Sequence, residues 1–453
     1  MSMVSGRVGT WASSGGSAAA GPPRLAPRRA RRKGRASLRA GLAGLILPGT
    51  EGRNDPFSNR PATGPVRMSR TRFYQGVGPV LTVWEPDPAA LSLTRLSEAR
   101  LAANVQYVWR HPARHVLYAA SSNGGPRRTG DRHFLQAFRI APGSGALTAH
   151  GGTIGLRARP IHLSIDRAGG FALVAYNEPS GVTVHRLGGD GALGEEVRQT
   201  VPPDGGIYGH QVLATPDNDA VILVARGNEA GAGKPEDPGA LKVFGFRDGQ
   251  LTLRQTVAPR GGYGFGPRHI DFHPTLPLVF VSLERQNRLA VFGLRDGRLT
   301  PEPLFTAETL RRPGAHPPQQ LAGGLHVHPN GRHVYVANRS DAMGEFEGRP
   351  IGLEGFENGI AVFDLDAEGR PSLAQSLEVG SFHPRTFSLD PSARMMVAAT
   401  IAGRRVRDGA GTAMRPASLA IFLVGEDGRL AFSSSIPVET GESMQFWTGM
   451  SAA

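Results

Sequence analysis

One short pattern recurs seven times along this chain, and no other feature limits the possible folds as strongly. Each copy is a run of alternating apolar residues that ends near an aromatic or imidazole ring, as in LKVFGF, LAVFGL and IAVFDL. Alternation with a period of two residues is typical of a strand that buries one face. The rings of successive copies are 47 to 71 residues apart. The seven ring positions are Trp84, Phe138, His185, Phe244, Phe292, Phe363 and Phe422.

A second pattern, a turn followed by an apolar strand, comes before six of these copies. Examples are HPARHVLYAAS, HPTLPLVFVSLE and HPNGRHVYVANRS. Several strands per repeat at a period of roughly 50 residues are typical of the blades of a β-propeller. Blades stack around an axis because one blade cannot bury both of its faces alone. We therefore predict an all-β fold, a seven-bladed β-propeller over residues 68–453.

The first copy has no turn-plus-strand partner before it, which leaves one blade incomplete. The C-terminal stretch ESMQFWTG, residues 442–449, can supply the missing inner strand beside RFYQGVG, residues 72–78. Pairing of the N- and C-terminal strands would close the ring and remove an open edge that invites aggregation. We expect this closure to complete the seventh blade.

The positive charge of the chain is concentrated before the propeller. The formal net charge is +13, and residues 1–67 contain twelve Arg or Lys but only two acidic residues. Low hydrophobicity and high charge favour disorder, so we predict a disordered basic extension over residues 1–67, with natural translation starting at Met68. A signal segment and a nucleic-acid-binding arm are the alternatives for this extension. The near-neutral remainder predicts a protein that binds no nucleic acid.

The absence of cysteine excludes disulfides, thiolate metal sites and a cysteine nucleophile. It fits a reducing compartment, and we expect a cytoplasmic protein. No apolar run approaches the roughly 20 residues that span a bilayer, so no membrane partner is expected. We predict no cofactor and no metal, because the sequence has no ligand set of recognisable spacing. A lone propeller is often self-sufficient, which makes a monomer the expected state.

Aligning the repeats on their turns places one position of each inner strand at the mouth of the axial channel. Cations that converge there repel one another and lose solvation, which an anionic ligand would relieve. Antiparallel pairing puts the start of a first strand beside the end of the second, so we predict that Arg268 and Glu284 are neighbours. The six aligned positions are Gln106, Ile161, His210, Arg268, Gly323 and Arg385.

Four stretches, in order and spanning about residues 68–450, resemble the β-propeller lactonase family. They are FYQGVGPVLTVWE, GPRHIDFHPTLPLVFVSLE, LHVHPNGRHVYVANR and HPRTFSLDPS. The resemblance implies a lactone hydrolase, with 6-phosphogluconolactonase-like activity on a small anionic lactone as the main expectation. A muconate-type lactonising cyclase or another lactonase is one alternative. A propeller that binds a ligand or a protein without catalysis is the other, because a fold does not fix a function.

The resemblance also implies a catalytic set in one cleft. In this hypothesis Glu284 takes a proton from water, and Arg268 keeps Glu284 ionised and polarises the carbonyl group. Arg339 or Arg385 captures the anionic group of the substrate, while His210 orients water or protonates the leaving alkoxide. The catalytic set is His210, Arg268, Glu284 and Arg339, and the additional substrate-binding residues are His269, Arg385, His162 and Gln106.

Departures from the family pattern at Leu283, Gly324 and Thr386 leave the substrate and the activity of the site open. A structural ion pair that ties two strands together is the alternative interpretation of Arg268 and Glu284. We interpret the histidines of the HP turns as turn formers. The acidic loop over residues 340–358 could line or block the cleft.

Overall fold

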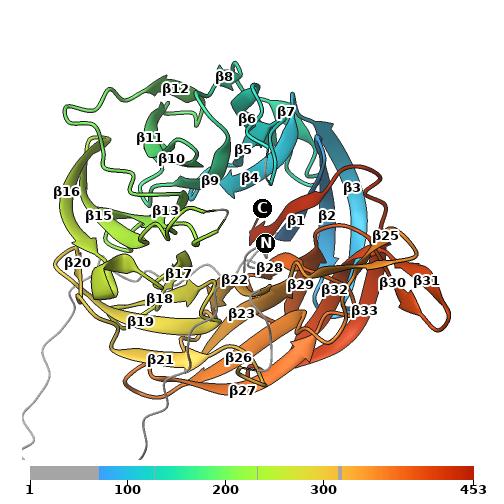
Figure 1. Ribbon diagram of the computed structural model, residues 1–453. Helices are drawn as coiled ribbons and strands as arrows, with labels where there is room; N and C mark the ends of the chain where they lie inside the picture. Colours follow the sequence, from blue (N-terminus) through green and yellow to red (C-terminus); the bar gives the residue numbers. More distant parts are fainter. Residues whose placement is uncertain (1–70, 127, 232, 315–318, 453) are drawn as a thin grey trace, which may run out of the picture. The chain divides into compact units, whose positions relative to one another are not determined.

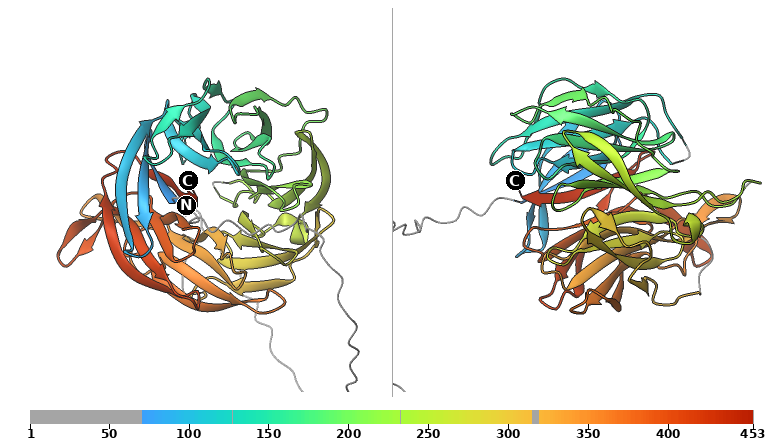
Figure 2. Two further views of the ribbon diagram at one scale, coloured as in Figure 1. Left: turned by 180° about the vertical axis from the view of Figure 1, so that it is seen from behind. Right: turned by 90° about the vertical axis from the view of Figure 1, so that its left-hand side faces the viewer.

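The innermost strands of seven antiparallel sheets surround a central axis (Figure 1). This computed structural model describes residues 71–452, except residues 127, 232 and 315–318. The predictions for residues 1–67 and for Met68 lie outside the described residues. The seven-bladed propeller is confirmed, and Figure 2 shows the same ring from behind and from the side.

From the axis outwards, each of blades 1 to 4 contains four strands in its main sheet. Blade 1 consists of β34 (Gln445–Ala452), β1 (Thr71–Val77), β2 (Val80–Asp87) and β3 (Ser92–Arg100). Blade 2 consists of β4 (Asn104–Arg110), β5 (Val116–Ser122), β6 (His133–Ile140) and β7 (Leu147–Ala149), with β8 (Ile154–Gly155) also on β6. Blade 3 consists of β9 (Pro160–Ile165), β10 (Phe171–Asn177), β11 (Ser180–Leu187) and β12 (Leu193–Glu196). Blade 4 consists of β13 (Gly209–Ala214), β14 (Ala220–Ala225), β15 (Ala240–Arg247) and β16 (Gln250–Val257).

Blades 5 to 7 repeat this order. Blade 5 consists of β17 (Pro267–Phe272), β18 (Leu278–Leu283) and β19 (Arg288–Arg295), with β20 (Arg298–Leu299) and β21 (Phe305–Glu308) both paired to β19. Blade 6 consists of β22 (Gln320–Val327), β23 (His333–Ser340), β26 (Gly359–Leu365) and β27 (Pro371–Glu378). Blade 7 consists of β28 (Pro384–Leu389), β29 (Met395–Thr400), β32 (Ala417–Val424) and β33 (Leu430–Val438).

The hydrophobic core lies between neighbouring blades. Phe244, a ring of the recurrent pattern on β15, is fully buried in one cluster with Leu173 and Val184 of the preceding blade. Phe292 on β19 occupies the equivalent place against residues of blade 4. Full burial of such a side chain contributes about 1.5–3 kcal/mol, so the repeated ring joins each blade to its neighbour.

The two ends of the chain share blade 1, as predicted. β34 pairs with β1 in antiparallel register, with Phe73 opposite Met450. Gln445 is fully buried, and its Nε2 donates hydrogen bonds to the carbonyl oxygens of Thr400 (2.9 Å) and Ser418 (3.0 Å) in blade 7. The closing strand therefore joins the first blade to the last.

The HP-turn histidines form turns and join adjacent blades. Nδ1 of His273 accepts hydrogen bonds from the backbone nitrogens of Thr275 (3.1 Å) and Leu276 (2.8 Å). Its Nε2 lies 2.8 Å from the carbonyl oxygen of Gly331, at the corresponding turn of the next blade. This geometry agrees with the interpretation as a turn former.

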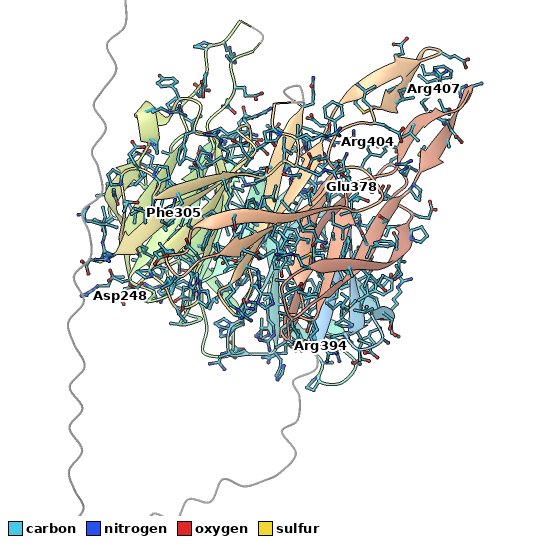
Figure 3. The ribbon with its side chains drawn as sticks, turned by 90° about the horizontal axis from the view of Figure 1, so that it is seen from below. Asp248, Phe305, Glu378, Arg394, Arg404 and Arg407 are labelled. Atoms are coloured by element: carbon cyan, nitrogen blue, oxygen red, sulfur yellow. The ribbon has the colours of Figure 1, made fainter. Side chains whose placement is uncertain are left out.

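In the part of the chain that the structure describes, two hairpins and one short helical turn lie outside the blade sheets. They are β24 (Met343–Phe346) with β25 (Arg349–Gly352), β30 (Arg404–Asp408) with β31 (Gly411–Arg415), and the 3-10 turn η1 (Pro259–Gly262). The hairpin that carries Arg407 projects from the ring (Figure 3). No helix among the described residues is long and apolar enough to cross a membrane.

Acidic residues of the loop over 340–358 make contacts elsewhere on the propeller. Glu357 is buried and accepts hydrogen bonds from the backbone nitrogens of Arg311 and Arg312. Glu354 forms an ion pair with Arg415 at 3.2 Å. Neither glutamate lines a cavity of the axial channel. The positions of these two glutamates therefore do not support the expectation that the loop lines or blocks the cleft.

Candidate functional site

Each blade has a β-bulge near the start of its innermost strand, and these bulges form the mouth of the channel. In β17, Pro267 pairs with Leu283 and His269 with Ser282, which leaves Arg268 as the extra residue. The same shift occurs in the other six innermost strands. A bulge bends its strand and changes the direction of a side chain. The bulge residues are Gln106, Ile161, His210, Arg268, Gly323 with Gly324, Arg385 and Phe446.

Glu284 is the buried carboxylate around which arginines from three blades gather. It directly follows β18, and its Oε1 lies 2.9 Å from Nε of Arg268. This contact is an ion pair rather than a hydrogen bond, because Nε–H does not point at the oxygen. Arg226, which follows β14, donates from Nη1 to Oε2 at 2.9 Å, and Arg339 on β23 donates from Nη2 to Oε1. The predicted proximity of Arg268 and Glu284 is confirmed.

The charges of this group do not balance. Burial alone would raise the pKa of Glu284, but Arg339, Arg226 and Arg268 outweigh it and hold that pKa well below its usual range. Burial, followed by the repulsion from Arg339, lowers the pKa of Arg268 to about 9. Three guanidinium groups therefore share one carboxylate in a site where side chains are almost fully buried.

A fourth arginine adds to this surplus of positive charge. Arg385 on β28 lies over the ring of Phe446 at 3.7 Å, and its Nε donates to the carbonyl oxygen of Phe446 at 3.1 Å. Burial first, and then Arg268 and Arg339, lower the pKa of Arg385 well below its usual value. We call Arg226, Arg268, Arg339 and Arg385, together with Glu284 and His210, the arginine site. An anion bound here would reduce the mutual repulsion of the arginines.

His210 supplies a neutral imidazole next to the arginines. It lies on β13, and its ring centre is 5.2 Å from that of His269. Burial and the nearby Arg268 and Arg226 hold the pKa of His210 well below 6.5. Its Nδ1 has no hydrogen-bond partner among the described residues. An uncharged ring with an unpaired nitrogen can orient water or exchange a proton with it.

The four substrate-binding residues predicted around this set have different surroundings. Arg385 belongs to the arginine site, and Nε2 of His269 lies 3.3 Å from Nη1 of Arg268. Gln106 accepts a hydrogen bond from Nε of Arg159 at 2.9 Å. His162 is fully buried and packs against the ring of Tyr107 at 4.0 Å, and it lines neither cavity of the channel. His162 therefore lies behind the residues that line the cavities, and its role in substrate binding stays a prediction.

The predicted site omits several members of the mouth. The repeat places Arg226 at the end of a second strand, as it does Glu284, and hence on the same rim, but Arg226 is not in the predicted catalytic or substrate-binding set. It also lies over the ring of Tyr208 at 4.0 Å. Phe446 is the bulge residue of β34, but the terminal strand has no following turn on which to align it. Arg159 lies over Phe446 at 5.4 Å, just before β9, and no repeat signal marks it.

The arginine site itself has little free space. A cavity of about 10 Å³ is lined by the bulge residues other than the two glycines of β22, together with Tyr107, His269, Thr386 and Trp447. A second, larger cavity of about 360 Å³ lies further along the axis, away from Glu284. The side chain of Arg226 keeps 17% of its surface exposed, against 4% for Glu284. Of this ion pair, the side chain of Arg226 is therefore the one nearer to solvent.

The position of Arg339 depends on a glycine in the bulge of β22. Nη1 of Arg339 donates to the carbonyl oxygen of Ala322 at 3.0 Å. A Cβ atom on Gly323 would lie 2.7 Å from this same nitrogen and 3.0 Å from the carbonyl oxygen of Ala337. The glycine at this aligned position thus leaves the space through which Arg339 reaches Glu284.

We expect Gly323→Ala to displace the side chain of Arg339. The affinity for inorganic phosphate should then fall about tenfold, which is the effect of losing one hydrogen bond between charged groups. Calorimetric titration with phosphate measures this change. Gly170→Ala is a matched control, because its added Cβ meets no atom within 4 Å. Equal phosphate affinity of Gly323→Ala and the control would show that Arg339 does not need this space.

Among the described residues, no group of three or more His, Asp or Glu side chains is arranged to hold a metal ion.

Residues 71–407 match the model of the family described as "Lactonase, 7-bladed beta-propeller". The chain belongs to this lactonase family. A 6-phosphogluconolactonase of Cronobacter sakazakii is 26% identical to this lactonase-family chain over 319 residues, which cover 70% of this chain and 83% of that protein.

Solved structures show the same fold. A periplasmic gluconolactonase of Pseudomonas aeruginosa superposes with a TM-score of 0.63 at 21% identity, covering 83% of this chain and 98% of that one. A protein from Lactobacillus plantarum gives a TM-score of 0.62 at 20% identity, covering 84% and 98%. At these identities the likeness concerns the propeller and not the substrate. The expected cytoplasmic location stays a prediction, since the Pseudomonas protein is named as periplasmic.

Proposed function

We propose that this chain hydrolyses a small anionic lactone at the arginine site, with a phosphorylated sugar lactone as the first candidate. The observation that carries the proposal is the surplus of buried positive charge around Glu284. Unpaired buried cations are costly unless a ligand compensates them. Membership of the lactonase family and the name of the Cronobacter relative support the reaction class.

The arginines have two tasks in this proposal. Arg226 and Arg385 are less deeply buried than Arg268 and Arg339, and they bind the phosphate or carboxylate that arrives from the rim. Guanidinium groups suit this task because they contact such anions through two parallel hydrogen bonds. Arg268 polarises the lactone carbonyl and stabilises the negative oxygen that forms during attack. These charges need no metal in the mechanism that we propose.

His210 moves the proton. The oxygen of water forms a bond to the carbonyl carbon while one proton passes from water to the unpaired nitrogen of His210. The bond between the carbonyl carbon and the ring oxygen then breaks, and the proton passes from His210 to that oxygen. The products are a hydroxyl group and a carboxylic acid, which ionises in water. A positioned acid–base group of this kind contributes roughly 10²–10⁴-fold to a rate.

Glu284 has a different task from the one that the sequence suggested. Its two oxygens already contact Arg226, Arg268 and Arg339, and its lowered pKa makes it a weak base. We propose that Glu284 is a positioning residue that keeps the three guanidinium groups in place. A loss of activity in Glu284→Gln could therefore result from an altered fold as well as from lost catalysis. For this reason we test the catalytic step with a substitution of His210.

We expect His210→Gln to lower kcat roughly 100-fold. The variant should leave the thermal unfolding temperature nearly unchanged, because Nδ1 has no partner to lose. The base acts when it is neutral, so activity should fall as the pH drops through the pKa of His210, which lies below 6.5 in the free protein. A bound anion offsets the field of the arginines and raises this pKa. The acid limb of kcat should therefore lie at higher pH than that of kcat/KM.

His185→Gln is the control for this prediction, because His185 is a buried histidine of β11 with a lowered pKa that lies outside the arginine site. Its activity profile should match that of the unmodified protein. A His210→Gln variant with full activity would contradict the role of His210. That result would not contradict the proposed lactonase activity, which the comparison of substrates tests separately.

The substrate test compares gluconolactone 6-phosphate, the non-phosphorylated gluconolactone and a muconate-type lactone, with spontaneous opening subtracted. We expect turnover of the phosphorylated lactone and a much higher KM without the phosphate. Equal efficiency on both sugar lactones would contradict phosphate capture by the arginines. The small free volume of the site favours one alternative, a propeller that binds an anion without catalysis. That alternative predicts phosphate binding but no turnover of any of the three.

A further inference from the structure

The larger cavity of the axial channel lies beyond the arginine site and has its own chemistry. Its volume is about 360 Å³, which is within the range of small-molecule sites, roughly 300–1,000 Å³. Only four of its lining residues, Tyr107, His269, Thr386 and Trp447, also line the small cavity of the mouth. It extends towards the ends of the innermost strands, where Arg110 and Ser451 lie. We call it the aromatic cavity.

Aromatic rings form one wall of this cavity. The rings of Tyr107 and Trp109 are stacked at 6.4 Å, and Trp447 lies 5.7 Å from Tyr107. Tyr107 and Trp447 also line the small cavity of the mouth, while Trp109 belongs only to the aromatic cavity. Flat apolar ligands gain binding energy from contact with such surfaces.

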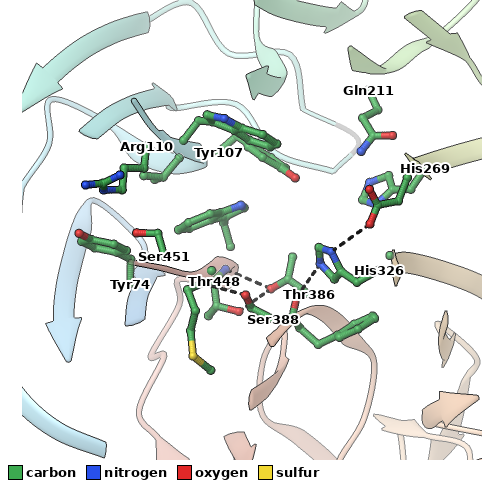
Figure 4. A pocket seen from close by; sticks show the side chains of 18 of the residues that line it. Tyr74, Tyr107, Arg110, Gln211, His269, His326, Thr386, Ser388, Thr448 and Ser451 are labelled. Carbon is green, nitrogen blue, oxygen red and sulfur yellow. Dashed lines mark hydrogen bonds and ion pairs between the residues drawn. The ribbon is translucent and has the colours of Figure 1, made fainter. Parts of the chain in front are cut away.

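Buried polar atoms that lack a regular hydrogen bond among the described residues occur at one end of the cavity only. Tyr74, Arg110 and Ser451 meet there (Figure 4). These atoms are Oη of Tyr74, Nε of Arg110 and Oγ of Ser451, and the hydroxyl groups of Tyr74 and Ser451 interact with each other. Arg110 also has no ion pair among the residues that the structure describes, and its Nη1 donates only to the carbonyl oxygen of His111 at 3.1 Å.

Several other polar groups of the cavity already have partners. Oγ1 of Thr386 and Oγ1 of Thr448 lie 2.9 Å apart, and Oγ of Ser388 accepts from the backbone nitrogen of Met450 at 2.8 Å. The oxygens of Asp271 accept from the backbone nitrogens of Phe272 (2.8 Å) and Val327 (2.9 Å).

Asp271 also sets the orientation of a ligand. Its Oδ2 lies 3.9 Å from Nδ1 of His326, and His326 lies on the side of the cavity opposite Arg110 (Figure 4). A negative charge at that side disfavours an anion near it, whereas the guanidinium group of Arg110 attracts one. The anionic end of a ligand therefore belongs at Arg110, Tyr74 and Ser451.

We propose that the aromatic cavity is a second ligand site, which binds a small aromatic carboxylate with its carboxylate on Arg110. The hydroxyl groups of Tyr74 and Ser451 donate to the same carboxylate, and the ring of the ligand lies against Tyr107, Trp109 and Trp447. Arg110 is only partly buried, but its guanidinium group has no counter-charge among the described residues, and a carboxylate would supply one together with a hydrogen bond to the unpaired Nε. This site is separate from the proposed lactonase function and does not depend on it.

The test uses 3-phenylpropionate and its neutral amide, which has the same shape, in calorimetric titrations of the full chain. We expect the acid to bind at least about tenfold more tightly than the amide, since a hydrogen bond to a charged group is worth about 1.5–3 kcal/mol. Arg110→Gln should remove this difference. Arg114→Gln, an exposed arginine of the adjacent turn, should keep it.

Two further variants make the result decisive. Tyr74→Phe keeps the buried ring and should weaken the binding of the acid severalfold, which tests the site even if Arg110→Gln does not fold. Arg385→Gln should leave the binding of the acid unchanged. If the acid instead lost affinity in Arg385→Gln and kept it in Arg110→Gln, it would occupy the arginine site. That result, or no binding of the acid by the unmodified protein at 10 mM, roughly the weakest useful affinity, would overturn the proposal.

Discussion

Glu284→Gln is expected to lower the free energy of unfolding by about 3–5 kcal/mol, the usual effect of removing one partner from a buried ion pair. The substitution leaves Arg226, Arg268 and Arg339 without a counter-charge, while the amide keeps the volume of the side chain. Urea unfolding at neutral pH measures the difference. Phosphate should restore part of the lost stability, because it binds the folded arginine site and not the unfolded chain.

The pH dependence of this effect has a definite sign. The pKa of Glu284 is lowered in the folded protein, so its contribution to stability is present above the unfolded pKa of about 4.3. It is lost as the pH falls through the folded pKa. The difference between Glu284→Gln and the unmodified protein should therefore be constant from pH 6 to 8 and shrink only in strong acid.

Glu229→Gln is the matched control for this substitution. Glu229 forms an ion pair with Arg285 at 2.6 Å on the same rim, but both side chains are about one third or more exposed. An exposed pair contributes about 0–1 kcal/mol, so this variant should be nearly as stable as the unmodified protein. Equal stability of the two variants would mean that water reaches Glu284, and the case for a buried charge surplus would fail.

Deletion of residues 445–453 should abolish the native fold. This change removes the closing strand β34, leaves β1 with an open edge and takes away the buried Gln445 and its bonds to blade 7. Burial of Phe446 and Trp447 adds about 1.5–3 kcal/mol each, which is large against the 5–15 kcal/mol of a typical domain. Size-exclusion chromatography and thermal unfolding should show aggregates and no cooperative transition.

Shortening the β30–β31 hairpin by a similar number of residues is the control, because this hairpin lies outside the blade sheets. We expect a monomer that unfolds cooperatively. A folded protein after deletion of β34 would show that the propeller is stable without the innermost strand of blade 1.

The fold was predictable from the sequence because each blade repeats the same alternation and the same turn. The closing strand was predictable too, since one blade lacked an inner strand and the C-terminal stretch fitted the gap. Blade 6 shows the limit of this reasoning. Its strands β23 and β26 are separated by the β24–β25 hairpin, which lengthens the repeat without changing the sheet.

The site was predictable where the repeat fixes geometry. Antiparallel pairing alone predicted that Arg268 lies beside Glu284, and the aligned positions fall in six of the seven bulges. The number of arginines on Glu284 was not predictable, because it depends on side-chain conformation across three blades. Arg339 reaches the carboxylate only because Gly323 has no side chain. The burial of His162 behind Tyr107 likewise depends on packing that no spacing in the sequence reveals.

The bulges at the mouth also bear on how this scaffold can be redesigned. A bulged residue stands outside the regular ladder of its strand, and the ladder continues on both sides of Arg268 and Arg385. Exchanging such a residue alters what the entrance selects while the sheets keep their register. Gln106, Ile161 and Phe446 are bulge residues outside the arginine site, so a library restricted to these three positions would vary ligand preference while the arginines and the sheets stay in place.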